Sequence, residues 1–257
     1  MKNVALITGA SSGIGEELAK IHAEKGGDLV LVARRIELLT VLKEELIKKY
    51  GVEVELIEQD LTTQNATKTI FQFTQDKKIK VDYLMNNAGF GGQGLFIDRP
   101  IEKDLEMIRL NISALVELTH LYLKEMQKNN FGKILNTAST AGFLPGPLQS
   151  TYFATKAFVI SFTRGLAQEL KKTGITVTAL CPGPVKTEFA KVAGMENAKL
   201  FENGVSARVT AFKGYNAMMK GKVICISQLS LAFAIPFILP FIPSSISAKI
   251  IHKLQEK

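Results

Sequence analysis

Residues 4–15 read "VALITGASSGIG" and decide the fold of this chain. The run 4–8 is almost continuously apolar, which is typical of a strand covered on both faces of a parallel sheet. Glycines follow at positions 9, 13 and 15, and a helical pattern begins behind them. Such a turn lets the backbone approach a pyrophosphate closely, while the helix N-terminus offers free N–H groups to the anion. The stretch predicts a dinucleotide-binding turn; the alternative is a glycine and serine turn that only starts the helix.

Six more apolar runs predict the remaining strands. They cover residues 29–33, 54–58, 83–86, 133–137, 176–181 and 222–226. Helical patterns lie between the runs, and two of them, 15–26 and 36–51, end at glycines, as helices often do. Strands that alternate with helices favour right-handed crossovers and a doubly wound parallel sheet. We therefore expect a single α/β domain with helices on both faces of the sheet.

The composition suits one large domain and excludes several classes of protein. The chain has 257 residues, of which 46% are hydrophobic and 22% charged, and its net charge is +8. The basic residues are scattered along the chain, so we expect no nucleic-acid partner. Cys181 and Cys225 are far apart and show no metal-ligand spacing, so we expect free thiols and no metal site. The N-terminus lacks the apolar core of a signal peptide, and we expect a cytoplasmic protein.

The end of the second predicted strand indicates which dinucleotide binds. An acidic residue there would hold the 2′-hydroxyl of an adenosine ribose. This chain has Arg34 and Arg35, and a guanidinium can donate two parallel hydrogen bonds to a 2′-phosphate. The sequence therefore favours NADP(H), with a pair of surface arginines as the alternative. After the third strand, Asp60 and Leu61 stand where an adenine edge could lie, and Asp60 could equally cap the next helix.

Six motifs make the chain resemble the short-chain dehydrogenase/reductase family. They are "TGASSGIG" (8–15), "NNAG" (86–89), Asn111, Ser139, "YFATK" (152–156) and "PGPVKT" (182–187), in the order and spacing of that family. The resemblance implies a Rossmann-like fold with a seven-stranded parallel sheet and a nicotinamide cofactor. It implies a cofactor-binding catalytic core over residues 1–190. Residues 191–257 would form a variable part of the same domain, with a substrate-capping region, a last strand and an apolar tail.

Tyr152 and Lys156 lie four positions apart on a predicted helix, so both side chains emerge on one face. A phenol with a pKa of about 10 is a poor base at neutral pH. A nearby cation favours the phenolate, so we expect Lys156 to lower the pKa of Tyr152 toward the range useful for acid–base catalysis. Carbonyl reduction needs such a group because it leaves an alkoxide that must be protonated.

The resemblance implies a complete catalytic set of Asn111, Ser139, Tyr152 and Lys156. It implies that Lys156 also binds the nicotinamide ribose and that the Ser139 hydroxyl bonds the substrate oxygen. It makes Asn111 the anchor of a water that relays protons to the lysine. Each residue has a structural alternative: a core tyrosine, a surface lysine, a turn serine and a cap asparagine.

The turn, the arginines and the resemblance together predict the residues that line the cofactor. Thr187 matches the family residue that holds the carboxamide, while prolines stiffen its loop. Asn87 and Gly89 follow the fourth strand, where a plain tight turn is the alternative. The predicted cofactor-binding residues are Gly9, Ser11, Ser12, Gly13, Ile14, Gly15, Arg34, Arg35, Asp60, Leu61, Asn87, Ala88, Gly89, Tyr152, Lys156, Pro182, Gly183, Val185 and Thr187.

The helix expected over 152–171 carries small residues at Ala154, Ser161 and Gly165, which predict the close approach of another helix. In the family the matching helix often forms a dimer contact, so we expect a homodimer or homotetramer. Packing within one chain would explain the same small residues.

The stretch 223–248 contains no charged residue, and lysines flank it at 220, 222 and 249. Its length would suffice for a transmembrane helix, but the last strand takes its first residues and prolines interrupt the rest at 236, 240 and 243. Three interpretations are open: an apolar flap beside the substrate site, a peripheral membrane contact or oligomer interface, and a membrane span.

We expect an NADP(H)-dependent oxidoreductase that interconverts a carbonyl and a secondary alcohol. Phe143, Leu144, Phe153 and Phe189 favour a hydrophobic substrate, such as a 3-oxoacyl chain or a steroid-like ketone. A non-catalytic dinucleotide-binding regulator or scaffold is the alternative, because a fold alone does not settle function.

Overall fold

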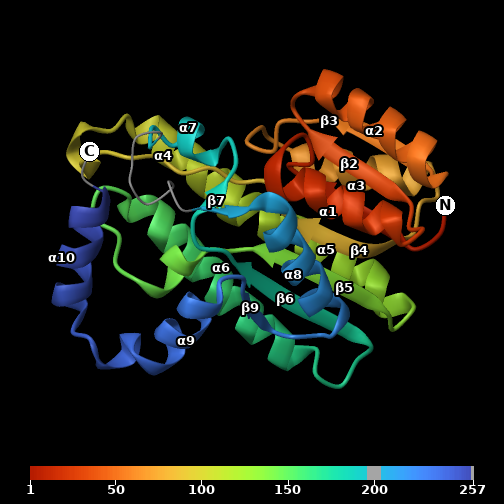
Figure 1. Ribbon diagram of the computed structural model, residues 1–257. Coiled ribbons are helices and arrows are strands. Elements are labelled where there is room, and N and C mark those ends of the chain that lie inside the picture. Colours follow the sequence, from red (N-terminus) through yellow and green to blue (C-terminus); the bar gives the residue numbers. More distant parts are fainter. Residues whose placement is uncertain (196–203, 256–257) are drawn as a thin grey trace.

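Seven parallel strands form the centre of the molecule in the computed structural model, and helices cover both faces of the sheet (Figure 1). In spatial order the strands are β3 (Val54–Glu58), β2 (Leu29–Ala33), β1 (Val4–Thr8), β4 (Val81–Asn86), β5 (Gly132–Thr137), β6 (Ile175–Cys181) and β9 (Ile224–Ile226). The winding direction reverses between β1 and β4, and this confirms the predicted doubly wound sheet. The structure describes residues 1–195 and 204–255, so the part of the predicted capping region at 196–203 lies outside the described residues.

The apolar runs of the sequence match these strands closely. The first three strands have the predicted bounds, and the next three begin one or two residues earlier than predicted. The last strand is shorter than the predicted 222–226, because the chain is still leaving a turn at Gly221, where φ is +64°. A separate pair of short strands, β7 (Val185–Lys186) and β8 (Val205–Ser206), was not predicted, since two residues carry no periodic pattern.

The helices form two layers around the sheet. The layer on one face contains α1, α2 and α8, and the layer on the other contains α3, α5 and α6. Gly26 follows α1 with φ +75°, and Gly51 ends α2 with φ +64°, as the sequence predicts. The bounds are α1 (Gly13–Glu24), α2 (Ile36–Tyr50), α3 (Ala66–Asp76), α4 (Ile101–Ile108), α5 (Leu115–Lys128), α6 (Ser150–Glu169), α7 (Phe189–Val192), α8 (Ala207–Met219), α9 (Leu229–Phe237) and α10 (Ser244–Gln255).

Strand β1 lies between the two helix layers and is buried along its whole length. Ala5 and Ile7 point into the core under α1 and α8, while Val4 and Leu6 point into the core on the other face. A strand covered on both faces needs apolar side chains on both, which explains why the sequence shows a continuous run instead of an alternating one.

A π-helical segment, Arg109–Ala114, joins α4 to α5. Its wider turn changes which side chains face inward, and such segments often occur at functional sites. The segment contains Asn111, which is almost completely buried.

The apolar tail folds as β9, α9, a short 3-10 turn (Leu239–Phe241) and α10. Helix α10 packs back onto the body of the protein: Ile251 contacts the apolar cluster that contains Tyr152, and the Gln93 side chain donates a hydrogen bond to the Gln255 carbonyl oxygen. This packing supports the flap interpretation for the inner side of the tail. Across residues 1–195 and 204–255, no helix combines the length and the apolar character that crossing a lipid bilayer requires.

A buried histidine joins the first helix to the C-terminal half of the chain. The His22 Nδ1 lies 3.0 Å from the Tyr215 hydroxyl of α8, and Nε2 lies 2.7 Å from the Asn3 carbonyl oxygen. The ring fills the space beside Gly27, where a Cβ would lie 2.2 Å from Nε2. Burial lowers the pKa of His22 below its ordinary value of 6.5, so the folded protein favours the neutral ring.

We expect the free energy of unfolding to decrease as the pH falls below about 6.5, because the unfolded chain then binds a proton that the folded His22 does not. Urea unfolding of the native protein and of His22→Gln between about pH 7.5 and 5.5 measures this dependence. The variant should be less stable at pH 7.5 but show a flatter pH profile. Parallel profiles for the two proteins would contradict the assignment.

Candidate active site

The glycine-rich turn 8–15 packs directly against the loop that follows β4. A Cβ at Gly9 would lie 2.9 Å from the Ala88 Cα, and one at Gly15 would lie 2.2 Å from the Gly9 carbonyl oxygen. Gly9 and Gly13 have φ angles of +65° and +60°, which glycine adopts without strain. The turn is therefore a cradle of bare backbone that any side chain would fill.

Hydrogen bonds connect this turn to the ends of β4 and β5. The Thr8 hydroxyl accepts hydrogen bonds from the backbone N–H groups of Asn87 and Ala88, both at 3.0 Å. The Asn87 side chain donates to the Thr8 carbonyl oxygen at 3.1 Å and accepts from the Thr137 hydroxyl at 3.3 Å. The carboxyl ends of three strands thus meet at one edge, where ligands bind in open α/β sheets. Thr8 and Thr137 were missed as site residues because a hydroxyl at a strand end forms no recognisable pattern.

Both arginines after β2 have carboxylate partners. The Arg34 Nη1 lies 3.7 Å from the Asp60 carboxylate, and the Arg34 side chain is exposed while Asp60 is half-buried. The Arg35 Nη2 lies 2.8 Å from the Glu188 carboxylate and 3.0 Å from the Ser12 Oγ. Arg35 therefore bridges the glycine-rich turn and the loop after β6. Exposed ion pairs contribute little stability, so Glu188 can be exchanged for another anion at small cost.

Asp60 does not cap a helix, so one of the two interpretations of this residue is wrong. Helix α3 begins only at Ala66, with Asn65 before it. The Asp60 carboxylate instead accepts hydrogen bonds from the Thr62 N–H at 2.9 Å and the Thr62 hydroxyl at 2.8 Å. These bonds hold it in the turn after β3, beside the buried Leu61.

Tyr152 and Lys156 are buried together on α6, with the Lys156 Nζ 5.8 Å from the centre of the Tyr152 ring. The ammonium donates a 2.8 Å hydrogen bond to the Thr137 carbonyl oxygen. Burial raises the pKa of Tyr152 to about 12, and a hydrogen bond with Ser139 offsets part of this increase. Burial also lowers the pKa of Lys156 to about 8. In the protein alone the pKa of Tyr152 therefore shifts upward, against the predicted direction, because loss of solvent is the main cause and Lys156 is not among the causes of the shift.

Ser139 lies two residues beyond β5 and begins a short 3-10 turn, Thr140–Phe143. Its hydroxyl accepts a hydrogen bond from the Ala141 N–H at 3.1 Å and donates to the Pro182 carbonyl oxygen at 3.3 Å. Since the Ser139 side chain also lowers the pKa of Tyr152 in part, it lies between the phenol and the loop after β6.

Asn111 connects the π-helical segment to two neighbours of the Tyr152 and Lys156 pair. Its Nδ2 donates to the Phe90 carbonyl oxygen at 3.0 Å and to the Thr155 hydroxyl at 3.1 Å, and its Oδ1 accepts from the Phe90 N–H at 3.2 Å. A Cβ at Gly89 would lie 2.9 Å from the Asn111 Oδ1 and 3.4 Å from the Lys156 Nζ. The amide oxygen and the ammonium therefore face the same small space. The alternative that Asn111 caps a helix is wrong, because the residue lies inside the π-helical segment.

The loop after β6 folds over the glycine-rich turn. A Cβ at Gly13 would lie 3.0 Å from the Thr187 Cγ2. Gln228, at the start of α9, accepts a 2.7 Å hydrogen bond from the Gly183 N–H and donates a 3.1 Å bond to the Pro184 carbonyl oxygen. The sequence did not indicate this role for Gln228. Three further predicted residues flank the same loop and turn: Ser11, whose hydroxyl accepts from Arg35, Ile14, which packs on the core, and Val185 in β7.

Comparison with known proteins identifies the family. The sequence profile of the short chain dehydrogenases matches residues 3–198. The chain is a short-chain dehydrogenase. It therefore belongs to a family of oxidoreductases that act on carbonyl and alcohol groups.

Several relatives of this short-chain dehydrogenase act on acyl substrates. It is 31% identical over 193 residues to the 3-oxoacyl-(acyl-carrier-protein) reductase of Aquifex aeolicus, covering 75% of the chain and 78% of the relative. It is 35% identical over 193 residues to the very-long-chain 3-oxoacyl-CoA reductase of Anas platyrhynchos, covering 74% of the chain and 62% of that relative. A short-chain dehydrogenase from Sphingobium yanoikuyae, solved with NADPH, is 33% identical, with a TM-score of 0.84 over 90% of this chain and 89% of its own.

Apolar side chains surround Tyr152 of this short-chain dehydrogenase. The Phe189 ring lies 5.3 Å and the Phe153 ring 6.1 Å from the Tyr152 ring, centre to centre. Leu144 and Ile251 pack into the same cluster. Ile251 was missed because it comes from α10, about a hundred residues further along the chain.

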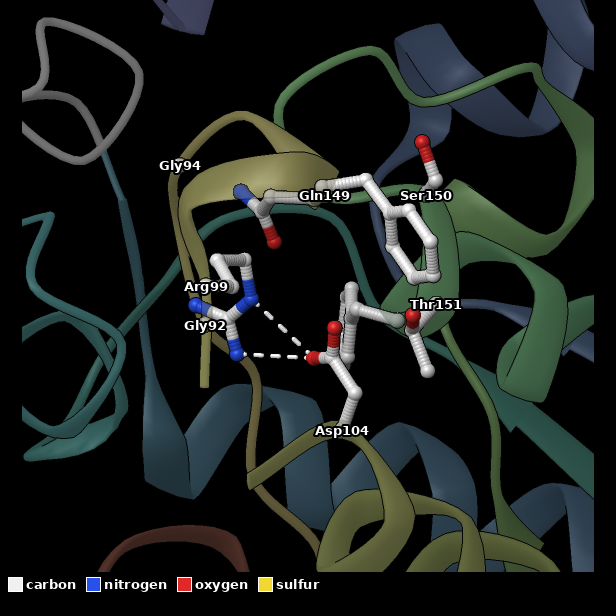
Figure 2. A pocket seen from close by; sticks show the side chains of 9 residues that line it. Gly92, Gly94, Arg99, Asp104, Gln149, Ser150 and Thr151 are labelled. Atoms are coloured by element: carbon white, nitrogen blue, oxygen red, sulfur yellow. Dashed lines mark hydrogen bonds and ion pairs between the residues drawn. The ribbon is translucent and has the colours of Figure 1, made fainter. Parts of the chain in front are cut away.

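A second, polar wall lies beside the tyrosine. Figure 2 shows the Arg99 guanidinium facing the Asp104 carboxylate, with the Gln149 side chain next to them, in a pocket that Tyr152 also lines. Arg99 donates to the Asp104 Oδ1 at 3.0 Å from Nε and 2.8 Å from Nη2. The Gln149 Oε1 has no hydrogen-bond partner among residues 1–195 and 204–255. Mainly apolar surroundings with a few polar groups are typical of sites for small organic ligands.

We expect the rate of carbonyl reduction to fall as the pH rises through about 8, because Lys156 then loses its charge. The pH profile of kcat/KM measures this, and Lys156→Arg is the matched variant, since its guanidinium stays charged to much higher pH. A profile that stays level well above pH 8 in the native protein would overturn the assignment.

Proposed function

We propose that this short-chain dehydrogenase is an NADP(H)-dependent oxidoreductase that interconverts a hydrophobic carbonyl compound and its secondary alcohol. The observation that carries the proposal is the pairing of a buried phenol, Tyr152, with a buried ammonium, Lys156, at the same sheet edge as the glycine cradle. The cradle would hold the dinucleotide and the phenol would exchange the proton.

The residues present fit a dinucleotide. The backbone of Gly9, Gly13 and Gly15 leaves the close approach that a pyrophosphate needs, at the N-terminus of α1. Lys156 would bind the nicotinamide ribose, and Thr187, which lies against the turn, would bind the carboxamide. When bound, the nicotinamide supplies the hydride.

Arg35 favours NADP(H) over NAD(H). Its guanidinium already bonds two anionic or polar oxygens, those of Glu188 and Ser12, next to the turn. A ribose 2′-phosphate could replace the Glu188 carboxylate as a charge-assisted partner. The related Sphingobium yanoikuyae enzyme binds NADPH, which agrees with this preference.

Tyr152 is the proposed acid, because an alkoxide is a stronger base than a phenolate and can take the phenol proton. With its pKa raised to about 12, the phenol keeps its proton at neutral pH and can donate it to an alkoxide. Ser139, whose side chain acts on the pKa of the phenol, would hold the same substrate oxygen. The Lys156 ammonium lies close enough to stabilise the phenolate that remains. In this scheme Asn111, whose amide oxygen faces the lysine, anchors a water that returns the proton from solvent.

The apolar cluster around Tyr152 supports a hydrophobic substrate. The aromatic rings of Phe153 and Phe189 and the side chain of Ile251 are the surfaces that an alkyl or ring system would contact. The two acyl reductases among the relatives agree with this choice.

The outer face of α6 supports a homodimer or homotetramer. Ala154, Ser161 and Gly165 are exposed, and a Cβ at Gly165 would meet no atom within 4 Å. The described part of the chain therefore does not use these small residues for its own packing, which leaves them for a second copy.

Tyr152→Phe tests the proposed acid. The variant keeps the ring but loses the hydroxyl, so turnover of a ketone should fall by roughly a hundredfold or more, while NADPH still binds. NADPH oxidation against a panel of ketones measures turnover, and quenching of cofactor fluorescence measures binding. If the native protein binds NADPH but reduces no carbonyl, the scaffold alternative replaces the enzyme.

Arg35→Ala tests the cofactor preference. Loss of the guanidinium should raise the Kd for NADPH by roughly tenfold or more and leave the Kd for NADH almost unchanged. Lys43→Ala, on α2 and away from the turn, is the matched control for loss of one positive charge. Equal weakening for both dinucleotides would show that Arg35 does not read the 2′-phosphate.

A further inference from the structure

The charged residues in the last part of the chain are nearly all basic. Residues 203–255 contain no aspartate or glutamate, although the whole chain has 24 acidic residues, and Glu202 and Glu256 border this stretch. Arg208 is paired with Glu17 and Glu24 of α1. The remaining cations of this stretch are Lys213, Lys220, Lys222, Lys249 and Lys253.

Helix α9 and the turn after it are apolar but exposed. Of the residues of α9, only Ile235 is buried. Phe233, Phe237 and Phe241 expose 62%, 64% and 83% of their surface. A helix that is apolar all round is normally buried in a protein core or a membrane.

The inner side of α9 packs only in part against the rest of the protein. An open pocket of ≈ 590 Å³ lies beside it, and residues of the sheet edge and of α6 also line this pocket. Its wall consists mainly of apolar side chains, among them Ile224, Ile226, Ile235, Leu239 and Ile242. The apolar composition of this segment is therefore not explained by the interior of the described chain.

Helix α10 has two different sides. Ser247 and Gln255 are buried against the body of the protein. The opposite side exposes Ile246 and Ile250, at 49% and 50%, together with the exposed Lys249 and Lys253. We define the tail face as Phe233, Phe237, Phe241, Ile246, Lys249, Ile250 and Lys253. Figure 1 shows α9 and α10 joined along one side of the molecule, away from the N-terminus and α2.

We propose that the tail face docks on an anionic lipid surface. Phenylalanine and isoleucine gain free energy by entering the acyl boundary of a bilayer, and nearby lysines are attracted to negatively charged headgroups. A contact between two copies through this face would instead bring Lys249 and Lys253 of both copies together, and the tail face itself holds no carboxylate to pair with them. The absence of acidic residues thus favours lipid over a second copy.

The docking is independent of the proposed enzymatic function, because none of the tail-face residues belongs to the catalytic or cofactor site. The docking has one consequence for the proposed enzymatic function. Since Ile251 of the same helix packs in the cluster around Tyr152, a docked protein would hold its substrate site next to the lipid. An apolar substrate dissolved in the bilayer would then be close to the site.

Sedimentation of the full-length protein with vesicles tests the proposal. The vesicles contain phosphatidylcholine alone or phosphatidylcholine with about one-third phosphatidylglycerol. The native protein should sediment with the anionic vesicles, less with the neutral ones and less at high salt. Phe237→Ser/Phe241→Ser and Lys249→Glu/Lys253→Glu should each reduce the partition coefficient by roughly tenfold or more.

The matched control is Val41→Ser/Lys48→Glu on α2, which removes an exposed apolar residue and a lysine from another part of the surface and should bind like the native protein. Circular dichroism, which does not depend on catalysis, verifies that all variants fold. The proposal fails if the native protein does not bind anionic vesicles, or if the tail-face variants bind as well as the control. Light scattering tests the other possible occupant. If the native protein does not bind vesicles and the tail-face variants change the oligomeric state, the face joins two copies and the proposal fails.

Discussion

The hydrogen bond from the Lys156 ammonium to the Thr137 carbonyl oxygen is the contact on which the site depends. It joins the second turn of α6 to the carboxyl end of β5, and α6 carries Tyr152 one turn earlier. A buried ammonium needs such a partner, because an unpaired charge in the interior is very costly. The bond thus fixes the helix, and with it the phenol, at the edge where the glycine-rich turn and the Asn87 loop meet.

Burial shifts the pKa values of Tyr152 and Lys156 so that both side chains favour their neutral forms. The pKa of the phenol rises to about 12 and that of the ammonium falls to about 8, so neither side chain behaves as it would in water. The buried thiol of Cys181 experiences the same effect, and its pKa rises to about 12. A protonated phenol beside an ammonium that is still charged at pH 7 is suited to give a proton to a developing alkoxide. The polar contacts of Ser139 and Asn111 then serve to orient these groups.

The C-terminal segment has an inner and an outer role. Its inner side completes the molecule: β9 closes the sheet, Gln228 bonds the loop after β6, and Ile251 enters the cluster around Tyr152. Its outer side exposes aromatic residues and lysines that no described part of the chain covers. Both roles follow from a segment with apolar side chains on two sides, since the body of the protein can cover only one of them.

The sequence by itself determined the sheet, the glycine-rich turn and the family, because strand periodicity, glycine positions and motif spacing are local properties of the chain. It also predicted that Tyr152 and Lys156 share a helix face. Only the tertiary structure decided the direction of their pKa shifts, which depend on burial by residues such as Phe189 and Ile251. It likewise decided that Arg35 pairs with Glu188, 153 positions away, and that the tail folds beside the site. Such contacts join residues that are distant in sequence, and no local pattern specifies them.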